Sequence, residues 1–265
     1  MTAISQIQLG AKSYFGSLRF LYKNGLMYVF AFPLVLSILL FALEFSLFEM
    51  AINPLEEMFH AQLKAIPRLN EFITGYGEWI WWIVSLLLHI IFFLFFSYTA
   101  GFIMLIILSP LLAWLSEQIE SKARGVKFDA SFAQIMADAF RGVRIAVRNM
   151  MLELSFALLL LFAGFIPVIG WFAPIVLYLV SSYYYGFSFL DYTNERHRRG
   201  VRESIMHIHM HKWLAISIGA GFALMMLIPW LGFILAGFAA ILSTTAATLA
   251  MLAIQSPQNR YIVKQ

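Results

Sequence analysis

The chain has 265 residues, of which 62% are hydrophobic and 12% are charged, against about 25% charged in ordinary soluble domains. This composition excludes a soluble globular domain and favours a single membrane domain, 1–265. The formal net charge is +4, and the lack of cysteine excludes disulfides and thiolate metal sites. Four runs contain no Asp, Glu, Lys or Arg: 24–43, 79–116, 154–190 and 213–259. Because roughly 18 apolar residues suffice to cross a bilayer, we predict an all-α integral membrane protein.

The charges between these runs predict how the chain is oriented. The 49–78 segment carries five glutamates and two basic residues, whereas 16 of the 18 Lys and Arg residues lie in 1–23, 117–150, 191–212 and the C-terminal tail. Basic loops are retained on the cytoplasmic side. We therefore expect 49–78 to face outward and both termini to be cytoplasmic. This asymmetry explains the positive net charge, so nucleic-acid binding is not needed.

The predicted segments alternate between membrane elements and polar connections. In chain order they are a cytoplasmic amphipathic N-terminus (1–24), a first long transmembrane helix (25–48), an external loop (49–78), a second long transmembrane helix (79–109), a cytoplasmic amphipathic region (110–150), a first hairpin (151–190), a cytoplasmic basic loop (191–212) and a second hairpin (213–255).

Three arginines recur at helical spacing in the amphipathic region before the first hairpin. Arg141, Arg144 and Arg148 are three and four residues apart, which places them on one face of a helix. Such a basic face fits an anionic lipid surface. The same face would also concentrate small anions by electrostatic attraction, and the two roles are compatible.

Each hairpin is predicted from a Pro-Gly turn inside an uncharged run. Pro167 and Gly170 interrupt the first run, and Pro229 and Gly232 interrupt the second in a similar sequence context. The two turns are either a repeat or two independent corners. An arm of the second hairpin, 213–230, rises about 25 Å as a helix, so the sequence leaves open whether the hairpins cross completely. The turns are candidate pore elements, or simple corners.

Small residues recur every four positions after the second turn. Gly232, Ala236, Ala240 and Thr244 share one helical face, which allows another backbone to come close. We expect this face to be buried against protein.

A histidine-rich segment precedes the second hairpin. His207 and His211 are spaced to share a helical face, which supplies at best half of a metal site. A partly protonated interfacial helix is the favoured interpretation, and metal binding is the weaker one. The chain has no nucleophile elbow, P-loop or H-E-x-x-H motif. We therefore expect no enzyme activity and no cofactor.

Several ordered segments carry a resemblance to a known family. They are 109–120 (SPLLAWLSEQIE), 165–170 (FIPVIG), Leu190-Asp191-Tyr192, Ile228-Pro229 and 244–247 (TTAA). In order and spacing this set resembles the CysZ-like sulfate permeases of the bacterial inner membrane, which share a domain with etoposide-induced proteins. No single motif is diagnostic, but the ordered set covers most of the chain.

The resemblance implies two long transmembrane helices, two partly inserted hairpins, assembly into a homo-oligomer and passage of sulfate for cysteine synthesis. It also implies a sulfate site at Ser17, Leu18 and Arg19, where serine replaces the family's glycine. His209 and His211 stand where relatives tend to have arginine, and Met27 and Tyr28 stand where relatives have an arginine pair. Arg19 is either an anion ligand or an anchor on lipid phosphates.

Three functions follow from these observations. The first is a channel or permease for sulfate or a related small anion, in contact with membrane lipids. The second is a non-transporting scaffold or regulator of a partner protein. The third, which ranks last, is a lipid-handling or metal-linked protein built on the histidine segment.

Overall fold

The computed structural model describes residues 1–64, 67–125, 132–166, 169–197, 199–228 and 231–255. Every regular element in these ranges is a helix. The elements are α1 (Ala3–Lys23), η1 (Met27–Phe30), α2 (Ala31–Lys64), α3 (Pro67–Arg124), α4 (Phe132–Ala163), α5 (Ile169–Arg196), α6 (Val201–Met210), α7 (Lys212–Met226) and α8 (Leu231–Gln255).

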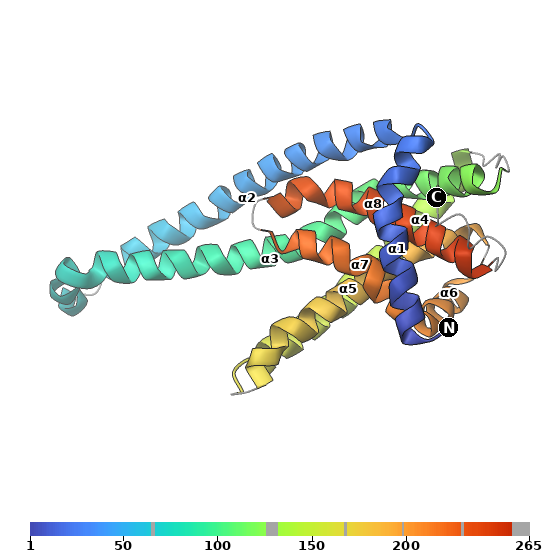
Figure 1. Cartoon of the computed structure of the whole chain (residues 1–265). Coiled ribbons are helices and arrows are strands. Elements are labelled where there is room, and N and C mark those ends of the chain that lie inside the picture. The colour runs from blue at the N-terminus through green and yellow to red at the C-terminus, as the bar shows by residue number, and fades with distance from the viewer. Residues whose placement is uncertain (65–66, 126–131, 167–168, 198, 229–230, 256–265) are drawn as a thin grey trace.

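Six of the helices pair into three hairpins, α2–α3, α4–α5 and α7–α8 (Figure 1). The turns of the three hairpins lie toward one side of the molecule, and the short helix α6 lies toward the other. Helix α1 runs across the hairpins and packs against α7 and α8. The end of the molecule where α1, α6 and the open ends of the hairpins meet is called the polar end below.

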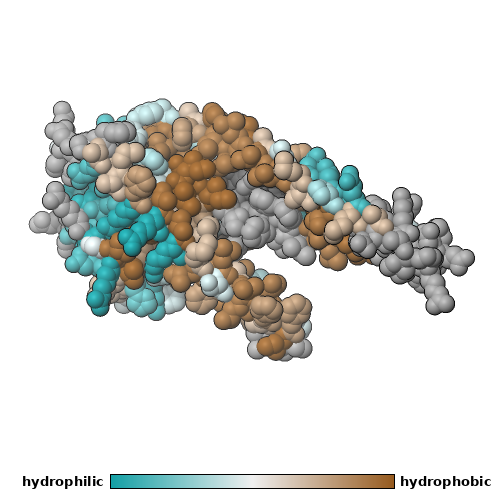
Figure 2. All heavy atoms as spheres, turned by 180° about the vertical axis from the view of Figure 1, so that it is seen from behind, coloured by the Kyte–Doolittle hydropathy of each residue, from teal (hydrophilic) through white to brown (hydrophobic). Residues whose placement is uncertain are grey.

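Five helical stretches are long and apolar enough to cross a membrane among the residues described: Met27–Leu55, Phe102–Arg124, Met136–Ala163, Gly170–Arg196 and Leu235–Gln255. Apolar residues cover the α4–α5 arm, and hydrophilic residues gather at the opposite end of the molecule (Figure 2). At the tip of this arm, Phe165 and Trp171 are each 81% exposed. Exposed aromatic surface of this kind is typical of contact with lipid rather than water. The chain is an all-helical membrane protein.

The α4–α5 hairpin is the first of the two hairpins predicted from the sequence, and its helix break lies where the sequence predicts a turn. Helix α4 ends at Ala163 and α5 begins at Ile169. The backbone N–H of Gly164 donates to the carbonyl of Leu160 at 2.8 Å, and that of Gly170 donates to the carbonyl of Ile166 at 3.0 Å. A Cβ at Gly170 would overlap the carbonyl oxygen of Gly164, so the turn requires glycine there.

The α7–α8 hairpin is the second hairpin predicted from the sequence. Its helix break lies between Met226 and Leu231, again at the predicted position. Pro167 and Pro229 lie outside the described residues, and Gly232 is described only as part of helix α8.

Several predicted connections are helical instead. The 49–78 segment was expected to be a loop, but α2 continues through it to Lys64 and α3 begins at Pro67. Its glutamates are good helix formers, and Pro54 lies inside α2 without ending it. Residues 110–124 extend α3, and 132–150 form the first half of α4, so the amphipathic region is not a separate interfacial helix. The 191–212 loop consists mainly of the end of α5 and helix α6.

Helix α8 lies at the centre of the fold, in contact with α1, α2, α3, α5 and α7. The predicted small-residue face is buried: Ala236 is 1% exposed, and Ala240 and Thr244 are fully buried. The Thr248 hydroxyl lies 2.8 Å from that of Ser116 on α3, where either can donate. Small side chains on α8 therefore allow five helices to approach one axis.

The closest helix crossing joins α5 to α7. A Cβ at Gly219 would overlap the carbonyl oxygen of Ser182, and a Cβ at Gly186 would overlap that of Ala215. The two backbones therefore touch directly, and each glycine leaves the space that the other helix fills.

Gly219→Ala should therefore destabilise the protein, although alanine favours a helix over glycine by roughly 1 kcal/mol. The added methyl would push α7 away from α5. We expect this variant to have a lower thermal unfolding midpoint than the unchanged protein. The midpoint is measured in detergent, with size-exclusion chromatography as the readout of folded protein. Gly16→Ala on α1 is the matched control, because nothing lies within 4 Å of its Cβ position. An unchanged midpoint for Gly219→Ala would contradict the direct backbone contact.

Candidate functional site

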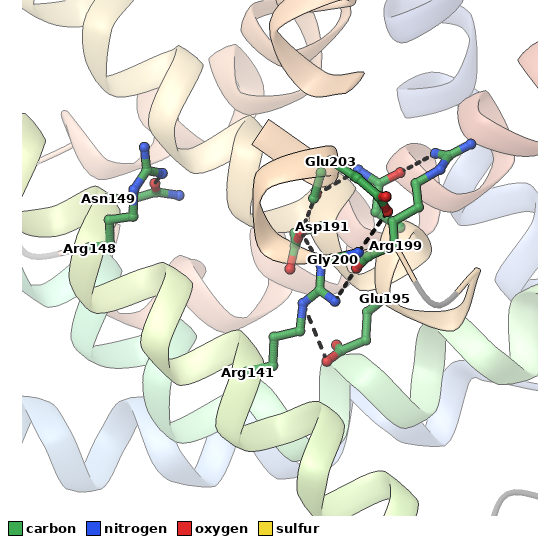
Figure 3. Close-up of polar contacts among 10 residues, drawn as sticks. Arg141, Arg148, Asn149, Asp191, Glu195, Arg199, Gly200 and Glu203 are labelled. Carbon is green, nitrogen blue, oxygen red and sulfur yellow. Dashed lines mark hydrogen bonds and ion pairs between the residues drawn. The ribbon is translucent and has the colours of Figure 1, made fainter. Parts of the chain in front are cut away.

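Arg141 on α4 is held by acidic residues of α5 (Figure 3). Its Nη2 donates to Asp191 Oδ1 at 3.2 Å, and its Nε lies 3.6 Å from Glu195 Oε1. The Arg141 Nη1 also donates to the carbonyl of Arg199. Asp191 is 2% exposed, so this cation is neutralised inside the protein.

The same cluster fixes α6. The Ser204 hydroxyl on α6 donates to Asp191 Oδ1. Asn194 Nδ2 donates to Ser204 Oγ at 2.9 Å, and the Gly200 N–H donates to Glu203 Oε2 at 2.9 Å at the start of the helix. Charge-assisted hydrogen bonds of this kind join α4, α5 and α6.

A second paired cluster surrounds Glu120 on α3, which is 1% exposed. Its carboxylate accepts from Arg196 Nε at 2.8 Å and lies 3.1 Å from Arg124 Nε. Arg124 Nη2 also donates to Gln255 Oε1 at 3.0 Å. This cluster joins α3 to α5 and to the end of α8, and its cations too are bound within the protein.

Arg148 lies apart from the Arg141 cluster, further along α4 (Figure 3). It borders a cavity of about 430 Å³ where α4, α5, α6 and α7 meet. We call this cavity the Arg148 pocket. Its lining residues are Arg148, Tyr183, Tyr184, Phe187, Ile205, His209 and Lys212. The lining contains three basic side chains and no acidic one.

Two contacts hold the Arg148 guanidinium in place. Its Nη1 donates to Asn149 Oδ1 at 3.1 Å, and its Cζ lies 5.6 Å from the centre of the Phe187 ring. Asn149 is fully buried, and its Nδ2 donates to Ser188 Oγ at 3.0 Å and to the Tyr184 carbonyl at 3.3 Å. A neutral amide and an aromatic face orient this cation.

The three predicted arginines therefore do not form one basic face. Arg141 is ion-paired, Arg148 borders the pocket, and Arg144 is exposed. Helical spacing alone could not show this, because α4 packs against α5 along the side that carries Arg141 and Arg148.

Of the three residues predicted to bind sulfate, one is buried and two are exposed. The Ser17 side chain is buried on α1, and its hydroxyl donates to the Tyr14 carbonyl at 2.6 Å. The hydroxyl proton is therefore already used within the helix and is not offered to an anion. Leu18 and Arg19 are exposed on α1. None of the three residues lines the Arg148 pocket.

The histidine segment forms helix α6 and the start of α7. The rings of His207 and His211 lie 4.7 Å apart, and His211 Nδ1 lies 2.9 Å from the carbonyl of His207. Within the described part of the chain, no group of three His, Cys, Asp or Glu residues is placed to hold a metal ion. Burial, with repulsion from Arg199 and His211, lowers the pKa of His207 to about 4. His207 is thus neutral at pH 7, and the expected partial protonation is wrong for this residue.

Sequence reasoning missed most of the pocket. Lys212 entered the sequence analysis only as part of the basic 191–212 loop, and Tyr183, Tyr184 and Phe187 belong to none of its motifs. The spacing of the two tyrosines from Phe187 along α5 is the one signal in the sequence, because residues three or four apart share a helix face. The partners on α4, α6 and α7 become visible only when the helices pack.

Arg141→Gln should lower the free energy of unfolding by about 3 kcal/mol, because it leaves the buried Asp191 carboxylate without its cation. Chemical denaturation in detergent micelles, followed by tryptophan fluorescence, measures this loss. Arg144→Gln, three residues further on the same helix but exposed, should unfold like the unchanged protein. Equal stabilities of the two variants would contradict the internal role of Arg141.

Comparisons with known proteins identify relatives of this chain. The family described as Sulfate transporter CysZ/Etoposide-induced protein 2.4 matches residues 13–237. A protein of Pectobacterium atrosepticum named Sulfate transporter CysZ is 28% identical over 172 residues, which are 64% of this chain and 62% of that protein. One of the same name from Pseudomonas syringae pv. tomato is 26% identical over 214 residues, 80% of this chain and 81% of that protein.

The match to the Pectobacterium protein thus spans less than two thirds of that relative's length. A third relative of this name, from Pseudomonas fluorescens, is 25% identical over 166 residues, 62% of this chain and 65% of that protein. These relatives are named as transporters, not as enzymes. Because the family match covers most of the sequence, the chain belongs to the Sulfate transporter CysZ/Etoposide-induced protein 2.4 family.

Proposed function

We propose that this chain carries sulfate or a related small anion across the bacterial inner membrane. The observation that carries the proposal is the family match over residues 13–237, with relatives named as sulfate transporters. The fold supports it, because the apolar hairpins suit a bilayer and the polar end holds cations beyond those that carboxylates neutralise. An anion that approaches the membrane would be attracted to that end.

The polar end is proposed to face the cytoplasm, as the distribution of Lys and Arg suggests. The two shorter hairpins are proposed to enter the bilayer from that side without crossing it. From Arg148 to Gly164, α4 rises about 24 Å, and the 15 residues of α7 rise about 22 Å. These two lengths fall short of the roughly 30 Å hydrocarbon layer, although the partner arms α5 and α8 are long and apolar enough to cross it. The longer α2–α3 pair is proposed to cross it fully.

Arg19 remains a proposed contact for the anion. It is exposed on α1 next to Leu18, and α1 packs on both arms of the α7–α8 hairpin. The same exposure suits an anchor on lipid phosphates, so a functional measurement must separate the two roles. The exposed apolar arms are proposed to contact lipid and further copies of the chain in a homo-oligomer.

Sulfate uptake into liposomes that contain the purified protein tests this proposal. We expect uptake above that of empty liposomes and a reduction of severalfold in Arg19→Ala. Lys12→Ala removes another exposed cation from α1 and should leave uptake unchanged. Equal losses in both variants would indicate a general surface-charge effect. The absence of uptake by folded protein would contradict transport and favour the scaffold role.

A further inference from the structure

We propose that the Arg148 pocket is a binding site for a sulfate- or phosphate-type oxyanion. The site is built from side chains that come from four helices, α4, α5, α6 and α7. It extends the proposed function by giving the anion a second location, away from Arg19, but binding there is measurable without any transport.

The charge of the lining is the first argument. Arg148 and Lys212 contribute two permanent cations, and His209 contributes a third basic group. By contrast, Arg141 on the same helix contacts Asp191 and Glu195.

Among the ion pairs of the described residues, none includes Arg148 or Lys212. The next acidic residue along α4 after Arg148 is Glu153, which is fully buried and does not line the pocket. Arg148 lies within electrostatic range of Asp191 on α5, but no acidic side chain lines the pocket, and such a lining suits an anionic ligand.

The second argument is that Arg148 is oriented before any ligand arrives. Asn149 accepts one N–H of the guanidinium, and Phe187, which is 1% exposed, lies against it. A guanidinium carries five N–H donors in a planar fork. Most of them therefore stay available for a bidentate contact with two oxygens of one anion, the geometry for which arginine is suited.

The remaining walls supply further donors and apolar surface. Tyr183 and Tyr184 each bring a phenol hydroxyl, and their rings meet edge to face with centroids 5.3 Å apart. Phe187 and Ile205 are the apolar side chains of the lining. A cavity of about 430 Å³ lies toward the small end of the usual ligand pockets.

Sulfate binding to the purified full-length protein tests the site directly. Radiolabelled sulfate would be titrated by scintillation proximity onto the unchanged protein and onto Arg148→Gln and Lys212→Gln. We expect each substitution to weaken binding at least tenfold. Arg144→Gln, an exposed arginine outside the pocket, is the control and should bind as before. Excess phosphate should displace the label, whereas chloride, which lacks oxygens, should not.

The oxyanion has two possible sources, a free ion or the phosphate group of a lipid. Native mass spectrometry on protein from nanodiscs of phosphatidylglycerol or phosphatidylcholine separates them. Retention of phosphatidylglycerol that is lost in Arg148→Gln and Lys212→Gln supports the site with a lipid as its ligand. Sulfate binding that is lost in the same variants supports it with a free ion. If neither ligand responds to the two substitutions, the proposal is wrong.

Folding and transport are controlled separately. Lys212 is exposed, so Lys212→Gln should fold even if Arg148→Gln does not, and size-exclusion chromatography verifies each variant. If the pocket variants bind sulfate as tightly as the unchanged protein and the protein takes up sulfate, the pocket proposal is wrong and the proposed function stands. Pocket-dependent binding without uptake would support the pocket and contradict transport.

Discussion

The hydrocarbon of a bilayer offers no partner to a charge or to an unpaired backbone group, and the rest of this structure follows from that constraint. Helices satisfy their own backbone, which is why the described elements are all helical. Most charged side chains gather where the open ends of the hairpins meet, apart from those of the 49–78 segment in α2 and α3. The molecule therefore has an apolar α4–α5 arm, a polar end and a second hydrophilic patch on the α2–α3 arm (Figure 2).

Within the polar end the cations serve two different purposes. Arg141, Arg124 and Arg196 are bound to buried carboxylates and hold helices α3, α4 and α5 together. Arg148 and Lys212 have no such partner among the ion pairs of the described residues and border a cavity instead. Buried pairs specify how helices meet, and unpaired cations attract ligands. A count of positive charges alone would not distinguish the paired cations from those that border the cavity.

Part of this organisation was readable in the sequence. The uncharged runs indicated membrane helices, the Pro-Gly motifs located both helix breaks, and the four-residue spacing of Ala236, Ala240 and Thr244 indicated a buried face. These features depend on local chemistry. The 49–78 segment was expected to be a loop and is helical in its described residues, because polar residues in a long helix look the same in sequence as those of a loop.

The candidate site was less predictable, because its partners are distant in sequence. Asp191 lies 50 positions from Arg141, and the Arg148 pocket joins four helices. The segments that carried the family resemblance are mostly in the core: Ser109, Glu120 and Asp191 are each at most 2% exposed. Those residues identify the fold, whereas the pocket is assembled mostly from residues outside the segments that carried the resemblance.

The central claim is that the α4–α5 hairpin enters the bilayer with its tip in hydrocarbon and its base at the polar end. The chain has no cysteine, so Phe165→Cys at the tip and Arg144→Cys at the base give clean single labels in proteoliposomes. We predict that a membrane-impermeant maleimide labels the base from one side, and that it labels the tip from neither side until detergent is added. Labelling of the tip from the aqueous phase would contradict the account.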